Sequence, residues 1–109
     1  MGNRTALVEE VYSLLSAGDV EKAVSHVTED AKWHVPGLGV EVEGREKVLE
    51  FTRGLYGRGF HQHVLHSAEY GDVVACWIEG TLPDGANYKS CVVHRFEGDK
   101  IAEYTSVRV

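Results

Sequence analysis

Apolar side chains recur at helical spacing in two segments at the start of the chain. The first runs through residues 7–15, with Thr5 as a candidate N-cap and Gly18 as a stop. A shorter segment follows Asp19, a second candidate cap, and keeps its apolar residues on one face as far as Val27. The pattern predicts a helical hairpin that is broken at the tripeptide "AGD".

The period changes to two after Asp30, in the pentapeptide "AKWHV". Pro36 then removes a backbone donor, so this strand is expected to be short or to lie at an edge. The alternating "GVEVEG" predicts a second small strand. Helical spacing returns from Arg45 to Tyr56 and predicts a third helix.

From His61 onward the pattern is that of strands alone. Four segments are separated by the turn signals "YGD", "PDGA" and "EGD". Helices followed by a run of strands are typical of an α+β domain. The sequence predicts one domain over residues 1–109, in which a curved antiparallel sheet wraps around three N-terminal helices and leaves a pocket between the two layers.

Composition narrows the possible partners. The formal net charge is −6 and no run of adjacent Lys and Arg exceeds two residues, so the pattern of a nucleic-acid binder is missing. No apolar run approaches the roughly 20 residues that span a bilayer, so we expect no membrane insertion and a cytoplasmic location. Cys76 and Cys91 fit no zinc motif and are interpreted as small buried hydrophobic residues.

Four motifs occur in the order and spacing of a known family: "AGD", "EDAKWHVPG", "VEGREKVLEF" and "HRFEGDKIAEY". On these motifs the whole chain resembles the SnoaL-like polyketide cyclases, within the superfamily of ketosteroid isomerase and nuclear transport factor two. The resemblance implies a cone-shaped α+β barrel, a pocket against the concave face of the sheet, and a homodimer through the outer face. The superfamily includes isomerases, cyclases, dehydratases, epoxide hydrolases and members that only bind or assemble.

The catalytic groups of the related enzymes do not carry over to this sequence. The isomerase base precedes the proline that ends the first strand, and Val35 stands there. Val92 matches the position of the proton-donating acid, and Val11 that of the tyrosine, with Tyr12 about 100° away around the helix. The cyclases keep a carboxylate on the last strand, where this chain has only Glu103. Any chemistry would therefore depend on other residues.

Strand alternation then assigns faces, if the residue before Pro36 faces inward as it does in the family. Trp33 and Val35 would line the pocket, and His34 would face away. One face of the fourth strand and one face of the fifth would also line the pocket. The opposite, apolar faces of these two strands would form the dimer interface. The pocket set is Val73, Ala75, Trp77, Glu79, Thr81, Tyr88, Ser90, Val92 and His94, and the interface set is Val74, Cys76, Ile78, Gly80, Cys91 and Val93.

Three residues are candidates for catalysis. Glu79 would be partly desolvated between Trp77 and Thr81, which raises a carboxyl pKa towards neutrality, although it could instead lie at the rim or pair across strands. His94 is the alternative proton carrier, and Tyr104 would orient a substrate oxygen. The candidate ligand contacts are Trp33, Val35, His63, Trp77 and Val92.

Two functions from different classes fit this pattern. The first is a cofactor-independent isomerase, cyclase or hydrolase that acts on a small apolar carbonyl, enol or epoxide compound. The second is a dimeric binding or assembly domain without chemistry, which the apolar Val35 and Val92 favour. His61 and His63 share a strand face, and such a pair can bind a metal ion. A third ligand would have to come from His94 or Glu79, and nothing in the spacing demands it, so we expect no metal site.

Overall fold

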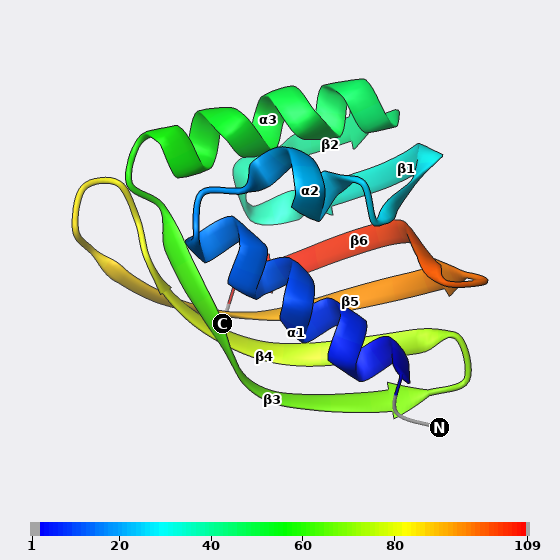
Figure 1. The fold of residues 1–109 in the computed structure, drawn as a ribbon. Coiled ribbons are helices and arrows are strands. Elements are labelled where there is room, and N and C mark those ends of the chain that lie inside the picture. Colours follow the sequence, from blue (N-terminus) through cyan, green and yellow to red (C-terminus); the bar gives the residue numbers. More distant parts are fainter. Residues whose placement is uncertain (1–2, 109) are drawn as a thin grey trace.

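The computed structural model describes residues 3–108 (Figure 1). In this part of the chain the helices and strands follow the expected order. Their bounds are α1 Asn3–Ser16, α2 Val20–Val24, β1 Val27–Val35, the short 3-10 helix η1 Pro36–Leu38, β2 Val40–Glu43, α3 Arg45–Gly57, β3 His61–Tyr70, β4 Val73–Thr81, β5 Asn87–Glu97 and β6 Lys100–Arg108. The prediction of three helices and a C-terminal meander is confirmed.

Two predicted boundaries were wrong. Thr5 lies inside α1 rather than capping it, and its hydroxyl donates to Glu69 Oε1 on β3 at 3.1 Å. Val27 opens β1 instead of closing α2, because α2 is only five residues long and the chain turns into the sheet directly after it. Gly18 ends the first helix as expected, with a φ of 86° that favours glycine.

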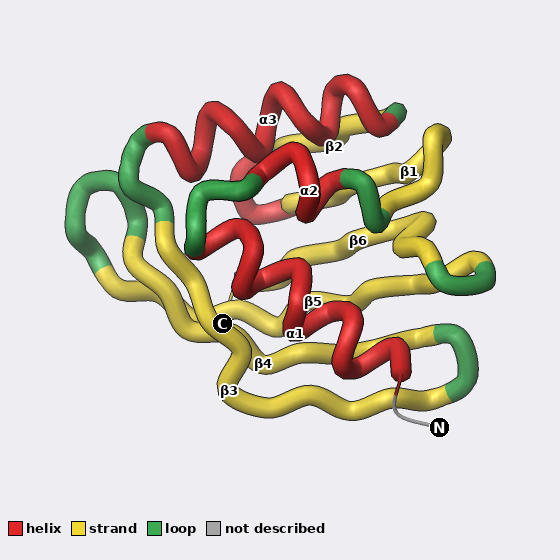
Figure 2. Tube along the Cα trace, in the orientation of Figure 1, coloured by secondary structure: helices red, strands yellow, loops and turns green. Residues whose placement is uncertain are grey.

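The sheet has the strand order β2-β1-β6-β5-β4-β3, as the neighbouring tubes in Figure 2 show. Every neighbouring pair is antiparallel except β1 and β6, which run parallel, so the sheet is mixed rather than wholly antiparallel. Hairpins fix the direction of strands that follow each other in sequence. They say nothing about β1 and β6, which residues 36–99 separate along the chain.

Irregular pairing bends the sheet at three places. The register shifts between Val64 and His66 on β3, across residues 28–31 on β1, and at Ala102 on β6. Each extra residue kinks its strand and increases the local twist. The sheet therefore curves around the helices without closing into a barrel (Figure 1).

The helices cover the concave face of the sheet and form the core with it. α1 packs against β3 and β4, α3 packs against β1 and β2, and α2 lies between the two longer helices (Figure 1). Residues that share the apolar faces of these elements are fully or almost fully buried, including Val8, Val27, Val48, Val74, Ile78, Val92, Phe96 and Ile101. None of the helices in residues 3–108 combines the length and apolar character needed to cross a membrane.

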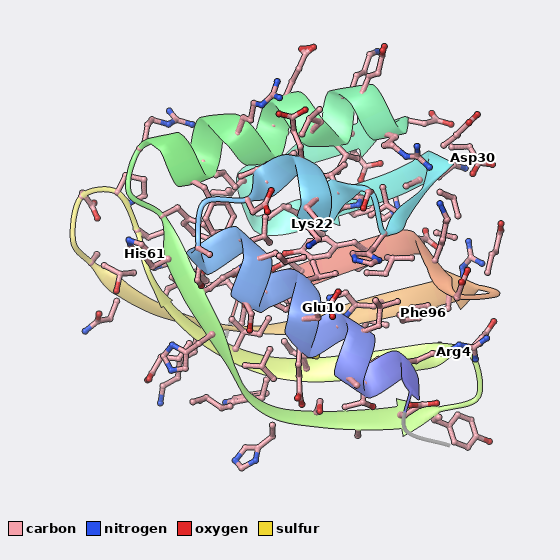
Figure 3. All side chains as sticks on the ribbon, viewed as in Figure 1. Arg4, Glu10, Lys22, Asp30, His61 and Phe96 are labelled. Atoms are coloured by element: carbon pink, nitrogen blue, oxygen red, sulfur yellow. The ribbon has the colours of Figure 1, made fainter. Side chains whose placement is uncertain are left out.

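The N-terminal turn of α1 closes one end of the cone. The Arg4 guanidinium donates to the carbonyl of Gly71 at 2.9 Å and to that of Gly98 at 3.0 Å, so one side chain holds the β3–β4 and β5–β6 turns together. The same group lies 5.5 Å from the ring centroid of Phe96, within cation–π range (Figure 3). A cavity lies toward the opposite end of the cone.

Gly80 permits a close approach of side chains on the concave face. It pairs with Gln62 on β3 and with Tyr88 on β5, and the Tyr88 hydroxyl donates to Gln62 Oε1 at 2.6 Å. A Cβ built at this position would lie 2.4 Å from the carbonyl oxygen of His61 and 2.7 Å from the Tyr88 ring. The hydrogen bond between Gln62 and Tyr88 therefore depends on glycine, which has no side chain, at position 80.

We expect Gly80→Ala to lower the free energy of unfolding by about 1–3 kcal/mol, because the added methyl group overpacks a site bounded by backbone. Urea denaturation measures this loss. Gly57→Ala is the matched control. The added Cβ would meet nothing within 4 Å, and Gly57 is the last residue of α3, where alanine favours the helical conformation. Equal stabilities of the two variants would contradict the role given to Gly80.

Candidate functional site

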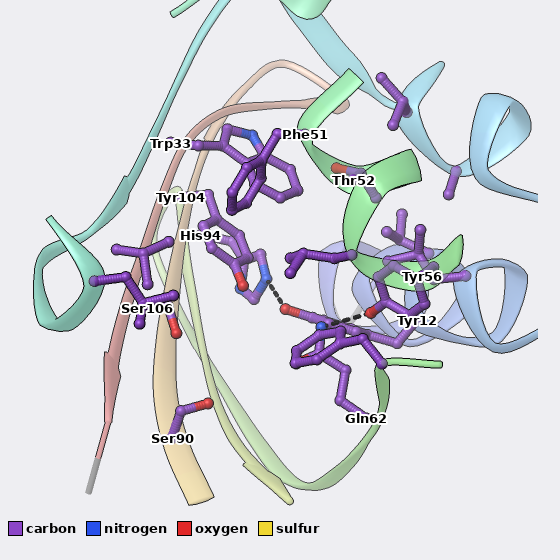
Figure 4. Close-up of a pocket in the computed structure, with 18 of the residues that line it drawn as sticks. Tyr12, Trp33, Phe51, Thr52, Tyr56, Gln62, Ser90, His94, Tyr104 and Ser106 are labelled. Atoms are coloured by element: carbon purple, nitrogen blue, oxygen red, sulfur yellow. Dashed lines mark hydrogen bonds between the residues drawn. The ribbon is translucent and has the colours of Figure 1, made fainter. Parts of the chain in front are cut away.

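A cavity of about 150 Å³ lies between the helices and the concave face of the sheet (Figure 4). Its walls are mainly apolar and aromatic: Val11, Leu15, Val24, Trp33, Val35, Phe51, Leu55, Tyr56, Phe60, Leu82, Ile101 and Tyr104. A few polar side chains interrupt them, namely Tyr12, Thr52, Gln62, Tyr88, Ser90, His94, Ser106 and Arg108. An apolar pocket with a few convergent polar groups is the usual form of a small-molecule site.

Six of the residues expected at the pocket line it, Tyr88 and Ser90 on β5 among them. Trp33 and Tyr104 stack with ring centroids 4.0 Å apart and planes 11° from parallel, and Val35 and His94 also line the cavity. Val92 is fully buried on the same face but is not among the lining residues, because it packs in the core. The expected faces of β1 and β5 were therefore right.

The expected face of β4 was wrong. Trp77 and Glu79 lie on the convex side of the sheet, where Trp77 is 39% exposed. His63 on β3 lies there too, its side chain 65% exposed and its Nε2 3.8 Å from Glu79 Oε1. Since Glu79 is outside the cavity, the mechanism in which it moves a proton inside the pocket fails.

The error on β4 has a physical cause. Its uniformly apolar set, Val74, Cys76 and Ile78, was assigned to a dimer interface, but these side chains are buried beneath the helices. Burial raises the pKa of the Cys76 thiol to about 12, which leaves it inert. The helices therefore cover the face of β4 that is apolar without interruption, and the mixed face of the strand lies on the convex side.

Tyr12 and His94 form a buried pair inside the cavity. The Tyr12 hydroxyl lies 3.0 Å from His94 Nε2, and His94 Nδ1 lies 3.1 Å from the carbonyl oxygen of Val74 (Figure 4). A carbonyl can only accept, so Nδ1 carries the proton and Nε2 accepts from Tyr12. The hydrogen of Tyr12 is thereby committed to His94, and its oxygen can accept, either from the neighbouring Tyr104 hydroxyl or from a ligand.

The burial of this pair keeps both members neutral. Burial lowers the pKa of His94 to about 4, although the hydrogen bond to Val74 opposes the change. Burial raises the pKa of Tyr12 well above its ordinary value, and it raises that of Tyr104 as well. At neutral pH the proton therefore stays on Tyr12, and His94 acts as a fixed acceptor that orients the hydroxyl.

A second hydrogen-bonded group in the cavity wall links β3 to α3 and to β5. Gln62 Nε2 donates to the Tyr56 hydroxyl at 2.7 Å, while Gln62 Oε1 accepts from Tyr88. The Tyr56 hydroxyl consequently keeps its own hydrogen free to donate to a ligand. The cavity therefore presents an acceptor at Tyr12 and a donor at Tyr56.

Two buried polar atoms around the cavity have no hydrogen-bond partner among the described residues. They are Trp33 Nε1 and Ser90 Oγ. Such atoms are rare in folded proteins, because an unpaired buried donor loses its bonds to water without replacement. Both side chains line the cavity, so a bound molecule is a natural partner for them.

Sequence reasoning missed several of these polar residues. Tyr12 does not match the family's tyrosine position, yet it belongs to a buried stripe with a 3.6-residue period, formed by Val8, Val11, Tyr12 and Leu15. Gln62 alternates with the exposed His61 and His63, so strand parity alone indicated that it faces inward. The local pattern was a better guide here than the family alignment.

The convex face carries a separate ionic cluster. His34 faces away from the cavity, as expected, and its two ring nitrogens lie 2.8 Å from Glu41 and 2.9 Å from Glu103. Bonds to Glu41 and then to Glu103 raise the pKa of His34, while His34 and Arg95 lower that of Glu103. Within residues 3–108 no three His, Cys, Asp or Glu side chains are arranged to hold a metal ion.

The buried neutral His94 makes a prediction for pH dependence. Its pKa in the folded state, about 4, lies below its unfolded value of about 6.5, so the unfolded chain binds the extra proton first. The contribution of His94 to stability is complete above pH 6.5 and is lost as pH falls towards 4, by about 2–3 kcal/mol.

Urea denaturation between pH 7 and 4.5 measures this loss. We expect His94→Gln to reduce the loss relative to the parent chain, and His63→Gln, which replaces an exposed histidine, to leave it unchanged. An identical pH profile for the His94 variant would show that His94 is not the buried titrating group.

Comparisons with solved structures reproduce the fold. An NTF2-like protein of unknown function from Cytophaga hutchinsonii superposes with a TM-score of 0.87 at 17% identity, over 98% of this chain and 90% of that one. A putative ketosteroid isomerase from Kribbella flavida gives 0.85 at 18% identity, over 97% and 77%. A de novo designed protein with a curved β-sheet gives 0.83 at 22% identity, over 97% and 84%. At these identities the likeness concerns the fold alone.

A comparison with curated proteins finds no match. The sequence itself matches the SnoaL-like domain over residues 8–104, which is nearly the whole chain. With the cone-shaped sheet, the helices on its concave face and the cavity between them, the chain belongs to the SnoaL-like domain family.

Proposed function

We propose that the chain binds a small, mainly apolar molecule in the cavity of the cone. The observation that carries this proposal is the pocket itself: aromatic and aliphatic walls surround a few fixed polar groups, two of them without a partner. The volume of about 150 Å³ limits the size of the ligand. An apolar cavity of about that volume accepts benzene, and drug-sized ligands need about 300 Å³ or more, so the ligand has about one ring.

The polar groups define what the ligand should carry. Tyr12 on α1 offers an acceptor, and Tyr56 on α3 offers a donor. The flat faces of Trp33 and Tyr104 are stacked on each other at the wall, and they suit contact with a ring. A planar molecule with one or two hydrogen-bonding substituents fits this arrangement.

A cofactor-independent isomerase, cyclase or hydrolase is the second candidate. The observation that favours it is the buried Tyr12–His94 pair, next to Tyr104, whose hydroxyl burial keeps protonated. Tyrosine hydroxyls in a dry site can stabilise negative charge that develops on a substrate oxygen. Among the described lining residues none is a carboxylate, and His94 is a weak base, so binding without chemistry is the favoured candidate.

A neutral one-ring probe tests the binding proposal. We expect 4-ethylphenol to shift the indole N–H signal of Trp33 in ¹H–¹⁵N spectra with a Kd of about 1 mM or below. The indole of Trp77, on the convex face, serves as an internal control and should not move. Ser106→Phe fills the mouth and should weaken binding at least tenfold, whereas Thr105→Phe, on the other face of β6, should not.

The same samples separate the two candidates. Proton spectra of the probe and of carbonyl, enol and epoxide analogues, followed for hours beside the protein, remain unchanged if the chain only binds them. Conversion of any analogue that Ser106→Phe suppresses would favour the enzyme. Shifts at Trp77 in place of Trp33 would contradict binding inside the cone.

We also propose a homodimer through the convex face of the sheet. Trp77, Cys91 and Val107 form one row across β4, β5 and β6, with Val93 beside it. Val93 is 38% exposed and Val107 is 52% exposed, an arrangement that a second copy would cover. Glu79 and Lys89 flank the row on one side and Arg95 and Glu103 on the other, so two copies related by a two-fold axis can pair opposite charges.

Sedimentation equilibrium tests the dimer. We expect Trp77→Glu to weaken association at least tenfold, because it places a charge in the middle of the apolar row. Ala6→Glu adds the same charge on the exposed face of α1 and should leave association unchanged. A parent chain that stays monomeric at millimolar concentration would overturn the proposal.

A further inference from the structure

We propose that the mouth of the cavity binds the carboxylate of a small monocarboxylic acid through Arg108, while the apolar body of the acid fills the cavity. This inference rests on the proposed binding function and specifies its ligand class. None of the catalytic positions of the related enzymes is involved.

Arg108 is the only ionised side chain among the described residues that line the cavity. The remainder are apolar, aromatic or neutral polar, and His94 is uncharged at neutral pH. The chain as a whole carries a net charge of −6, so a general attraction for anions is absent. A single cation at an otherwise apolar site selects a ligand with one negative charge.

Strand geometry directs Arg108 towards the cavity. Residues of one parity on β6, Tyr104, Ser106 and Arg108, all line it. Arg108 is also exposed, which places it at the mouth rather than in the interior. A carboxylate there keeps part of its hydration and avoids the large penalty of an ion in the apolar interior.

The electrostatics of Tyr88 support this placement. Burial raises the pKa of Tyr88, and the neighbouring Tyr104 raises it further, but the charge of Arg108 acts in the opposite direction. Tyr88 and Arg108 both line the cavity, so the positive charge acts on the concave side of the sheet. A planar guanidinium can hold both oxygens of a carboxylate with two parallel bonds.

Ser90 supplies the second observation. It pairs with Arg108 across the β5–β6 ladder, so the two side chains are direct neighbours on the concave face. Ser90 is 1% exposed, and its hydroxyl has no hydrogen-bond partner among the described residues. A carboxylate held by Arg108 would bring an acceptor next to this unpaired donor.

A matched pair of probes tests the charge directly. We expect 3-phenylpropionate to bind at least tenfold more tightly than 3-phenylpropionamide, which has the same shape without the charge, as read from the Trp33 indole shift. Arg108→Gln should remove this preference, because a charge-assisted hydrogen bond contributes about ten- to a hundredfold in affinity. Arg108→Lys keeps the charge without the paired donors and should retain part of the preference.

Lys89→Gln is the matched control. Lys89 is the neighbour of Ser90 on β5, its side chain is exposed on the convex face, and its loss changes the net charge by the same amount. The preference for the acid should survive in this variant. Ser90→Ala should weaken the acid and leave the amide nearly unchanged.

The outcomes separate this inference from the proposed function. If the amide shifts Trp33 but the acid binds no more tightly, the carboxylate anchor is wrong and the pocket proposal stands. Equal loss of preference in Arg108→Gln and Lys89→Gln would also overturn the anchor, because general charge would then explain it. If neither probe nor 4-ethylphenol shifts Trp33, both proposals fail.

Discussion

The curvature of the sheet is the constraint on which the rest of the molecule depends. Bulges at Leu65, across residues 28–31 and at Ala102 bend a six-stranded sheet so that its concave face surrounds the helices. The apolar side chains of α1 and α3 fill most of this concavity, and a cavity of about 150 Å³ remains at the open end. A flat sheet with the same residues would pack against the helices and leave no such space.

Polar groups within this cavity hold one another in place through hydrogen bonds. His94 is fixed by the Val74 carbonyl and in turn fixes Tyr12, while Gln62 joins Tyr56 to Tyr88 above Gly80. Each of these bonds restricts the rotation of a hydroxyl or amide before any ligand arrives. Because the donors and acceptors are already oriented, a ligand would lose little affinity to their ordering.

The sequence predicted the fold well and the site in part. Hydrophobic periodicity placed the helices and strands, because helices and sheets bury one face each. The parallel pairing of β1 with β6 lay beyond that reasoning, since no local signal encodes a contact between strands that are more than 60 residues apart. The wrong assignment of the two faces of β4 has a similar cause. Strand alternation separates the residues into two faces, but only tertiary packing shows which face the helices cover. The inward orientation of Tyr12 and Gln62 follows from the local periodicity of their elements, although neither residue matches a catalytic position of the family.

The bulge on β3 has a further consequence at the boundary of the sheet. The strand order leaves β3 and β2 at the two edges, where unpaired backbone groups can recruit strands from other chains. The irregular register near Leu65 interrupts the flat hydrogen-bonding row of β3, and β2 is only four residues long, with Glu41 and Glu43 exposed. The distortion that makes room for a cavity thus also protects the molecule against edge-to-edge aggregation.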